Sequence, residues 1–200
     1  MKPLPNIFAY STESFYALGV AATDKKAIAE LFRLKKREVG KPIALIAANL
    51  KQVEKFFVLS PEEKVLAKKY WPGSLTILLR AKSSIAVSAL LGKSKYTDFK
   101  KRSYSLLAKR VSFGKEGRIG IRVPKHAQAR TLARAVKAPI TATSANISGQ
   151  PPTKSARKVK RDFPGILVMS GRCGKQTRPS TIISLDKTKI NIIRHGAVNV

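Results

Sequence analysis

The fold is decided at Pro139-Ile140-Thr141-Ala142-Thr143-Ser144-Ala145-Asn146-Ile147-Ser148-Gly149, a segment that changes character half way along. Its first residues are apolar or β-branched, which is typical of a β-strand. Small hydroxyl residues, an amide and a glycine follow, and such residues let an anionic ligand approach the backbone amides. Because ligands of open α/β sheets lie at the carboxyl ends of strands, the segment predicts a ligand site at a sheet edge. Taken alone, the same composition is more often a polar loop without a ligand.

Strand and helix patterns alternate along the rest of the chain. Apolar runs bounded by turn residues predict strands at 6–10, 43–48, 75–79, 119–123, 166–169, 181–185 and 190–193. Amphipathic spacing and capping residues predict helices at 24–36, 50–57, 60–70, 126–136 and 154–162. The alternation predicts a single α/β domain over residues 1–200, with a twisted mixed β-sheet flanked by helices.

Four residues give local signals within these elements. Ser60 is expected to cap a helix with Glu63 as its reciprocal partner, and Thr153 is expected to cap the basic helix that follows it. We interpret Trp71 as a packing residue rather than a stacking platform for a ligand.

The net charge is far from zero. The chain has 40 Lys and Arg against 11 Asp and Glu, a formal net charge of +29. A field of this sign attracts polyanions such as nucleotides and nucleic acids. The alternative is a lysine-rich surface that only prevents aggregation. The size of the imbalance favours a polyanion partner.

Residues 81–117 are the least regular part of the sequence. Basic residues there alternate with Tyr96, Phe99 and Tyr104, a combination that suits single-stranded nucleic acid. We interpret this segment as a basic insertion within the domain, with direct RNA contact as the alternative.

The remaining composition narrows the class of protein. Cys173 is the only cysteine, which excludes an intramolecular disulfide and a cysteine metal cluster. No apolar run is long enough to cross a bilayer, and the N-terminus lacks a signal-peptide pattern. We therefore expect a cytoplasmic protein that does not associate with membranes and holds no metal of its own.

A group of cations follows the predicted helix at 24–36. In an extended chain, Lys35 and Arg37 would point to the same side, next to Lys41. Such a group can clamp a triphosphate or pyrophosphate. The alternative is a solvated last turn of the helix, where cations are also favoured.

Seven short segments can be compared with known motifs. They are Ser11-Thr12-Glu13-Ser14-Phe15-Tyr16-Ala17-Leu18-Gly19, Lys35-Lys36-Arg37-Glu38 with Pro42-Ile43, Trp71-Pro72-Gly73-Ser74-Leu75-Thr76, Ile119-Gly120-Ile121-Arg122-Val123-Pro124, Ser144 to Gly149, Pro179-Ser180-Thr181-Ile182 and Arg194-His195-Gly196-Ala197. In this order they resemble the motifs of the L-threonylcarbamoyladenylate synthases of the YrdC-like fold. Each motif is weak alone, whereas the ordered set is specific and covers most of the chain outside 81–117.

The sequence departs from the family pattern at four places within these motifs. Ser11 stands for a proline, Ser14 for a threonine, Ala17 for a glycine, and Glu38 for the proline after Arg37. Ser14 keeps the hydroxyl. Glu38 would place an anion beside the cation group and weaken nucleotide binding.

The resemblance implies a reaction and its partners. Family members join L-threonine, bicarbonate (or CO2) and ATP to give threonylcarbamoyl-AMP and pyrophosphate. Partner proteins then move the activated group to an adenosine beside the tRNA anticodon. The chemistry needs charge neutralisation and alignment of the phosphates more than a covalent nucleophile. Magnesium would be held mainly by the nucleotide and water.

The resemblance also suggests roles for individual residues. Lys35 and Arg37 are expected to be the catalytic cations. Nucleotide binding is assigned to Arg37, Lys41, Thr143, Ser144, Asn146 and Arg194, and threonine binding to Ser14, Arg122, Ser144 and Ser180. For Arg122 the alternative is a surface salt bridge, and for Ser180 a helix or turn cap.

Two other functions fit the same residues. The first is a non-catalytic RNA-binding protein of the same fold that acts in tRNA or ribosome handling, which the net charge supports. The second is a related acyl-adenylate or carbamoyl-transfer enzyme for another amino acid. Pyrophosphate release that needs ATP, threonine and bicarbonate together distinguishes the expected enzyme from both.

Overall fold

The computed structural model describes residues 6–37, 42–82, 85 and 118–200. The strands are β1 (Phe8–Ser11), β2 (Tyr16–Gly19), β3 (Leu45–Ile46), β4 (Phe57–Val58), β5 (Leu75–Ala81), β6 (Arg118–Arg122), β7 (Ile140–Thr141), β8 (Thr143–Ser144), β9 (Leu167–Val168), β10 (Thr181–Asp186) and β11 (Lys189–Arg194). The helices are α1 (Lys25–Leu34), α2 (Leu50–Phe56), α3 (Pro61–Tyr70), α6 (Ala127–Ala135) and α7 (Ala156–Asp162). In this part of the chain no helix is long and apolar enough to cross a membrane.

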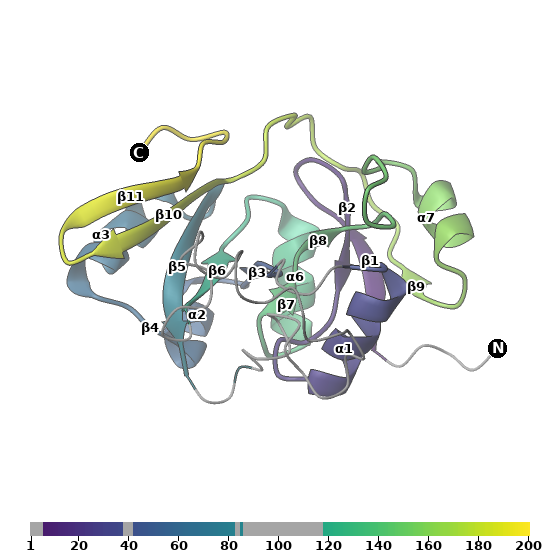
Figure 1. Cartoon of the computed structure of the whole chain (residues 1–200), viewed down its shortest axis with the longest axis horizontal. Helices are drawn as coiled ribbons and strands as arrows, with labels where there is room; N and C mark the ends of the chain where they lie inside the picture. Colours follow the sequence, from purple (N-terminus) through teal and green to yellow (C-terminus); the bar gives the residue numbers. More distant parts are fainter. Residues whose placement is uncertain (1–5, 38–41, 83–84, 86–117) are drawn as a thin grey trace, which may run out of the picture.

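The strands form two mixed sheets (Figure 1). The smaller sheet has the order β8-β2-β1-β9, and the larger has the order β11-β10-β5-β6-β3-β7, with β4 beside β5. The predicted α/β class with mixed strand directions is confirmed. The strands divide between two sheets because the chain leaves the larger sheet after β7 and pairs with β2 as β8, with only Ala142 between the two strands.

The directions of the strands give the larger sheet two distinct ends. β3 and β6 run parallel, β5 runs antiparallel to β6, and β10 runs parallel to β5. β6 therefore ends at Arg122 where β5 and β10 begin, and β11 also ends there because it is antiparallel to β10. We call this the Arg122 end of the sheet. The opposite end, where β6 begins, is the Arg118 end.

Side chains cap four of the described helices, and one of the two caps expected from the sequence lies at a different residue. The Asp24 side chain accepts from Ala27 N, and Ser60 and Glu63 form a reciprocal capping box at the start of α3. The prediction that Thr153 caps the basic helix is wrong. Ser155 caps α7 by accepting from Lys158 N, while Thr153 Oγ1 accepts from Ser155 N and so supports the cap.

Trp71 is a packing residue, as the sequence suggested. Its ring lies against the core, and Nε1 donates a 2.7 Å hydrogen bond to Leu75 O. Position 73, two residues later, requires a glycine for steric reasons, because a Cβ there would collide with the Tyr70 carbonyl oxygen. This turn sets where β5 begins.

Helix α1 ends in a turn that differs from the extended chain expected after it. Lys36 has φ +50°, Arg37 N donates to Phe32 O, and Lys36 N donates to Arg33 O. This pair of bonds is the Schellman arrangement that closes a helix C-terminus. The expected extended alternation of Lys35 and Arg37 is therefore wrong. The turn sends the Lys35 side chain inward and leaves Lys36 exposed.

Candidate functional site

The predicted site residues that the structure describes fall into two neighbouring groups, and Glu13, which was not predicted as a site residue, belongs to the second. The first, the Lys35 cluster, contains Lys35, Arg37, Thr143, Ser144 and Asn146. The second, the Arg122 cluster, contains Glu13, Ser14, Arg122, Ser180 and Arg194. Lys41 and Glu38 lie outside the described residues.

Lys35 is almost completely buried, with 1% of the residue exposed. Its Nζ donates to Ser144 O, to Asn146 O at 2.6 Å and to Asn146 Oδ1 at 3.5 Å, and its own carbonyl accepts from Ser148 N at 2.9 Å. Burial, and then the nearby Arg37 guanidinium, lower the pKa of the Lys35 ammonium from 10.5 to about 7. The surrounding oxygens favour the charged form. Lys35 thus ties the end of α1 to the loop after β8.

Asn146 organises the loop that follows β8. Its Oδ1 accepts from Ser144 Oγ at 2.5 Å, and its Nδ2 donates to Ile147 O at 3.2 Å and to Gln150 O. The amide is 8% exposed, and much of its hydrogen-bonding capacity is used within the loop. Ser144 is exposed whereas Thr143 is buried, so only Ser144 presents its side chain to a ligand from outside.

Arg37 lies beside this loop. Its guanidinium donates from Nη2 to Pro42 O at 3.1 Å and is close enough to lower the pKa of Lys35. The residue is half-buried. Since Lys35 contacts Asn146 directly, Arg37 and Asn146 lie on the same side of the molecule, as a shared site requires.

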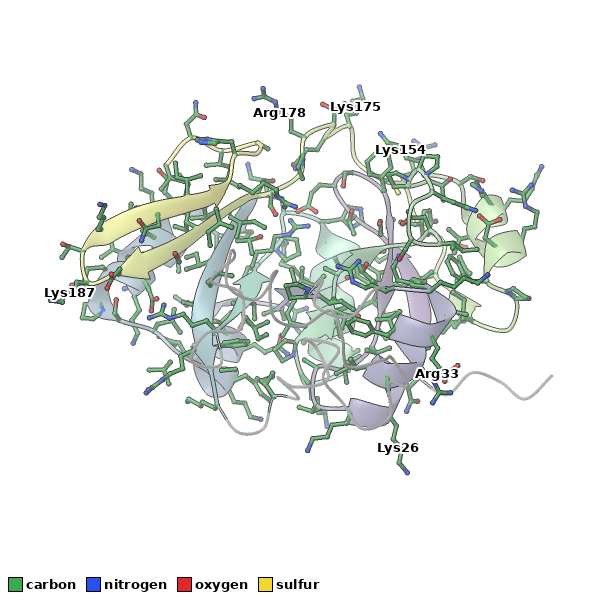
Figure 2. The ribbon with its side chains drawn as sticks, in the orientation of Figure 1. Lys26, Arg33, Lys154, Lys175, Arg178 and Lys187 are labelled. Atoms are coloured by element: carbon green, nitrogen blue, oxygen red, sulfur yellow. The ribbon has the colours of Figure 1, made fainter. Side chains whose placement is uncertain are left out.

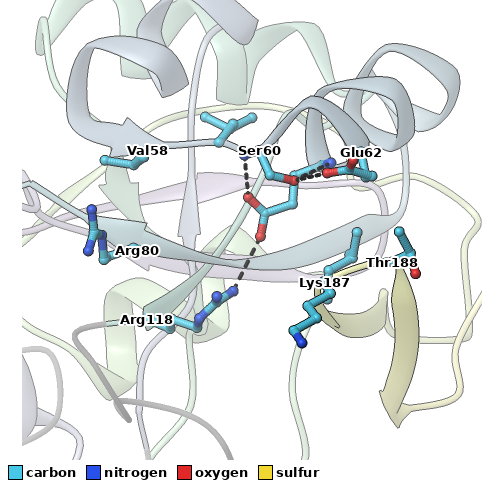
Figure 3. Close-up of a pocket in the computed structure, with 10 residues that line it drawn as sticks. Val58, Ser60, Glu62, Arg80, Arg118, Lys187 and Thr188 are labelled. Atoms are coloured by element: carbon cyan, nitrogen blue, oxygen red, sulfur yellow. Dashed lines mark hydrogen bonds and ion pairs between the residues drawn. The ribbon is translucent and has the colours of Figure 1, made fainter.

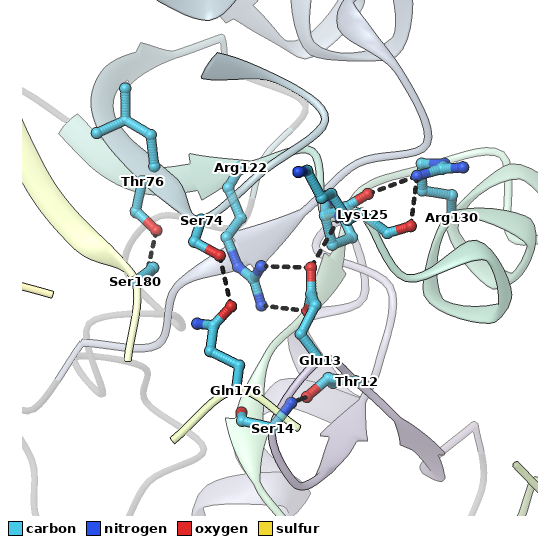
Figure 4. A network of polar contacts seen from close by, with 12 residues as sticks. Thr12, Glu13, Ser14, Ser74, Thr76, Arg122, Lys125, Arg130, Gln176 and Ser180 are labelled. Carbon is cyan, nitrogen blue, oxygen red and sulfur yellow. Dashed lines mark hydrogen bonds and ion pairs between the residues drawn. The ribbon is translucent and has the colours of Figure 1, made fainter. Parts of the chain in front are cut away.

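Arg122 is held by a two-pronged ion pair with Glu13 (Figure 4). Nη1 lies 3.0 Å from Oε1 and Nη2 lies 3.2 Å from Oε2, and Lys125 N also donates to Oε1 at 2.8 Å. Burial alone would raise the pKa of Glu13, but Arg122 and these hydrogen bonds together lower it below the ordinary 4.5. The two side chains are 14% and 13% exposed, so this is not the surface salt bridge considered as the alternative for Arg122.

Ser180 connects Arg194 to the start of β5. Its Oγ lies 2.9 Å from Thr76 Oγ1 (Figure 4), and Arg194 donates to Ser180 O at 2.8 and 3.1 Å and to Oγ at 3.1 Å. Partial burial, and then the Arg122 guanidinium, lower the pKa of Arg194. Two guanidinium groups thus lie near each other at the Arg122 end, with Glu13 paired to only one of them.

The loop 170–179 closes over the turn between β1 and β2. Gly174 N donates to Thr12 O at 2.9 Å, and Gln176 N donates to Glu13 O at 3.1 Å. Ser74 Oγ donates to Gln176 Oε1 at 2.7 Å (Figure 4), so this loop also contacts the start of β5. A Cβ at Gly174 would collide with the Glu13 carbonyl, which explains the glycine.

The same loop carries cations that point outward. Lys175 and Arg178 are exposed and project away from the ribbon, along the side of the molecule where Lys154 also lies (Figure 2). Lys154 Nζ donates to Gly174 O at 3.0 Å and lies 5.7 Å from the centre of the Phe15 ring. The rim of the candidate site is therefore positively charged.

The β1–β2 hairpin joins the two clusters. Glu13 contacts Arg122, whereas Tyr16 O accepts from Ala145 N at 2.8 Å and Ala17 pairs with Ser144. Glu13 and Tyr16 are three residues apart, a span of at most about 11 Å. Ser14 lies between them, so the structure brings the predicted residues it describes to one region.

Sequence reasoning missed several contributors to this region. Glu13 was quoted only as part of a motif, and Thr76, Ser74 and Gln176 were assigned no role. Glu13 carried a usable signal, because it is the only carboxylate in the turn that connects two strands. The other three form hydrogen bonds between distant segments and leave no local pattern.

The chemistry of the region is that of an anion site. It offers guanidinium groups, a buried ammonium, hydroxyls and backbone amides. Among the described residues, no three His, Cys, Asp or Glu side chains gather as a metal site. The arrangement suits binding of phosphates and a carboxylate.

Comparisons with known proteins identify relatives of this chain. A family model described as "Telomere recombination" (Sua5_yciO_yrdC) matches residues 5–196. A protein of Chromobacterium violaceum named "Threonylcarbamoyl-AMP synthase" is 31% identical over 186 residues, which cover 92% of this chain and 84% of that protein. A protein of Cellvibrio japonicus with the same name is 34% identical over 182 residues, with 90% and 84% covered.

A solved structure extends the comparison to three dimensions. The crystal structure of P. abyssi Sua5 complexed with L-threonine superposes with a TM-score of 0.76 at 29% identity. The match covers 96% of this chain and 50% of the other, so the chain spans about half the length of that Sua5 protein.

Proposed function

This chain belongs to the Sua5/YciO/YrdC family, and we propose that it is a threonylcarbamoyl-AMP synthase. The observation that carries the proposal is that curated relatives with this name match about nine-tenths of the chain at 31% and 34% identity. The reaction joins L-threonine, bicarbonate or CO2, and ATP to give threonylcarbamoyl-AMP and pyrophosphate. The anion-binding character of the Arg122 end and the Lys35 cluster supports this assignment.

The bond changes define what the residues must do. The threonine nitrogen first bonds to the carbon of bicarbonate with loss of water, or to that of CO2 with loss of a proton. One oxygen of the resulting carbamate attacks the α-phosphorus of ATP. The bond from that phosphorus to the bridging oxygen breaks, and pyrophosphate leaves with its electron pair. Negative charge is concentrated on the phosphates throughout, so positioned cations lower the barrier.

The nucleotide is assigned to the Lys35 cluster and Arg194. Arg37 and Lys41 hold the phosphates, and Ser144 with the backbone near Thr143 and Asn146 lines the nucleotide and carbamate site. The contacts of Lys35 change its proposed role, because its ammonium already donates to the carbonyls of Ser144 and Asn146. Lys35 acts as a positioning residue that fixes this loop.

Threonine is assigned to the Arg122 cluster. Two of the five N–H donors of Arg122 are used by Glu13, so others are left to bind the threonine carboxylate. Glu13 fixes the plane of the guanidinium, and Ser14 and Ser180 place the amino acid. The structure in which P. abyssi Sua5 holds L-threonine supports an amino-acid site within this fold.

Magnesium would accompany the nucleotide. Among the described residues of the two clusters, the carboxylate is that of Glu13, which is paired with Arg122, so the side chains of the site suit Mg2+ poorly as ligands. The ion would be held by the phosphate oxygens and water, where it neutralises phosphate charge.

The cellular setting follows from the same proposal. The whole chain 1–200 is one YrdC-like domain with 81–117 as a basic insertion, and it works in the cytoplasm. Proteins that modify tRNA accept its product. The basic rim attracts ATP and allows RNA contact.

Arg37→Ala tests the site. Wild-type protein is expected to release pyrophosphate only when ATP, threonine and bicarbonate are all present. The substitution should lower that rate by about 100-fold, as loss of a cation at developing charge does in other enzymes. Arg33→Ala is the matched control, because Arg33 is 58% exposed near the end of α1 and pairs with Glu30. Unchanged release in Arg37→Ala would remove Arg37 from the site.

The same assay separates the alternatives. Tight RNA binding with a steep dependence on salt and no pyrophosphate release would favour the non-catalytic RNA-binding protein. Equal release when serine replaces threonine would favour a related enzyme for another amino acid.

A further inference from the structure

A cavity lies at the Arg118 end of the larger sheet (Figure 3). Its volume is about 430 Å3, which is within the range of small-molecule sites. The ends of β4 and β5, the start of β6, the start of α3 and the β10–β11 turn surround it. β10 separates it from the synthase site: Ser180 lies at one end of this strand and Leu185 near the other, about 16 Å away.

Two arginines lie directly opposite each other on neighbouring strands that border the cavity. Arg80 of β5 and Arg118 of β6 are direct partners in the antiparallel register, so their side chains leave the sheet on the same side. Like charges directly opposite each other destabilise a sheet. The Arg80–Arg118 pair therefore lowers the stability of the sheet, and since both arginines line the cavity, a ligand there that binds them would explain the pair.

The carboxylates near the arginines only partly compensate them. Glu63 is 5% exposed, and its oxygens accept from Ser60 N at 2.8 Å and from Arg118 Nη1 at 3.2 Å. Glu62 is exposed and accepts from Ser60 Oγ at 2.7 Å. Both carboxylates therefore accept hydrogen bonds from Ser60 at the start of α3. Of the two arginines, Arg118 forms an ion pair with one of them, Glu63.

Lys187 adds a third cation from the β10–β11 turn. It lines the cavity and has φ +53°, which places a lysine in a conformation that favours glycine or asparagine. Within the described part of the chain, neither Lys187 nor Arg80 has an acidic partner. With Glu62 and Glu63 counted, the residues that line the cavity carry three positive and two negative charges, so one positive charge is in excess.

Part of the wall is apolar, beside the polar Ser60 and Thr188. Val58, Leu59 and Leu185 supply this part of the wall, and Val58 is 43% exposed. A cavity with cations on one side and aliphatic side chains on the other suits a ligand with an anionic group and an apolar body.

We propose that this cavity binds a phosphate group, as a phosphate monoester or as inorganic phosphate. Arginine forks bind phosphate oxygens in pairs, and Arg80 and Lys187 are the cations of the lining that have no ion pair within the described residues. The apolar wall favours the monoester over the free ion. The site is independent of the synthase reaction, because it lies at the other end of the sheet.

The test follows backbone amides by NMR in the full chain. AMP, inorganic phosphate and adenosine are titrated separately, and shifts are read at Leu59, Ser60, Lys187 and Thr188. AMP bound at the synthase site leaves these amides unshifted, so the two sites are distinguishable. We expect AMP and phosphate to shift them saturably, AMP at lower concentration, and adenosine to have no effect. Equal dissociation constants for AMP and phosphate would identify inorganic phosphate as the ligand.

Variants make the result decisive. Arg80→Gln and Lys187→Asn should each weaken AMP binding at these amides about tenfold, and asparagine suits the backbone at position 187. Lys189→Asn is the matched control, since it removes the same charge from β11 outside the cavity. The proposal fails if neither anion shifts these amides, if adenosine binds as well as AMP, or if both variants bind like Lys189→Asn.

Discussion

Two site residues, Lys35 and Arg122, show how far a local pattern can lead. Both were predicted as cations of the candidate site, and the structure places each of them in one of its two clusters. Their partners, however, are 109 positions away in the sequence: Ser144 for Lys35 and Glu13 for Arg122. Contacts at that separation depend on the topology of the sheets, so residue types predicted the chemistry of the site but not its hydrogen bonds.

The Glu13–Arg122 pair predicts a dependence of stability on pH. The pKa of Glu13 is lower in the folded than in the unfolded protein, so its stabilising effect is present above about pH 4.5 and is lost as pH falls through the folded-state pKa. Glu13→Gln should cost about 2 kcal/mol of unfolding free energy at pH 7. The difference from wild type should shrink at pH values below the folded-state pKa.

Urea unfolding across this pH range checks the prediction. Glu30→Gln is the control, because the exposed pair of Glu30 with Arg33 is worth less than about 1 kcal/mol. A Glu13→Gln difference that stayed constant down to acid pH would show that the carboxyl is not held by Arg122.

Whole elements were predicted best where capping residues mark their ends. Asp24, Ser60 and Pro61 mark the starts of α1 and α3. The lengths of the two-residue strands were overestimated. Residues 43–48 were expected to form one strand, whereas β3 contains only Leu45–Ile46. Its neighbours β6 and β7 pair with it over those residues alone, and this limit depends on the tertiary arrangement.

The turn after α1 predicts opposite effects for two glycine substitutions. Lys36 has φ +50°, so Lys36→Gly relieves a left-handed conformation and should stabilise the protein by about 0.5 kcal/mol. Lys26 lies within α1 and is also exposed to solvent, so Lys26→Gly should destabilise the protein by about 0.5–1 kcal/mol. Thermal and urea unfolding measure both. A loss of stability in Lys36→Gly as large as in Lys26→Gly would contradict the described turn.

At the scale of the molecule, the alternation of strands and helices predicted the class but not the division into two sheets. That division occurs at Ala142, where nothing in the sequence marks a change of partner strand. It places the Lys35 cluster on the smaller sheet and the Arg122 cluster at the end of the larger one, with the β1–β2 hairpin between them. The candidate site therefore lies where the two sheets meet.

The net charge is also a property of the whole molecule. The net charge of +29 predicted a polyanion partner, and cations of the described chain lie along the rim of the candidate site (Figure 2). Composition could not assign these cations to a surface, because that requires the path of the loop 170–179. Nor could it reveal the cavity at the Arg118 end, which depends on the β5–β6 register.

The most direct test of the central claim is mass spectrometry of the reaction product. The protein is incubated with ATP, L-threonine and isotopically labelled bicarbonate. The account predicts threonylcarbamoyl-AMP that carries the label, together with pyrophosphate, and neither when any substrate is omitted. Absence of this adduct from wild-type protein, or an AMP adduct of threonine without the label, would contradict it.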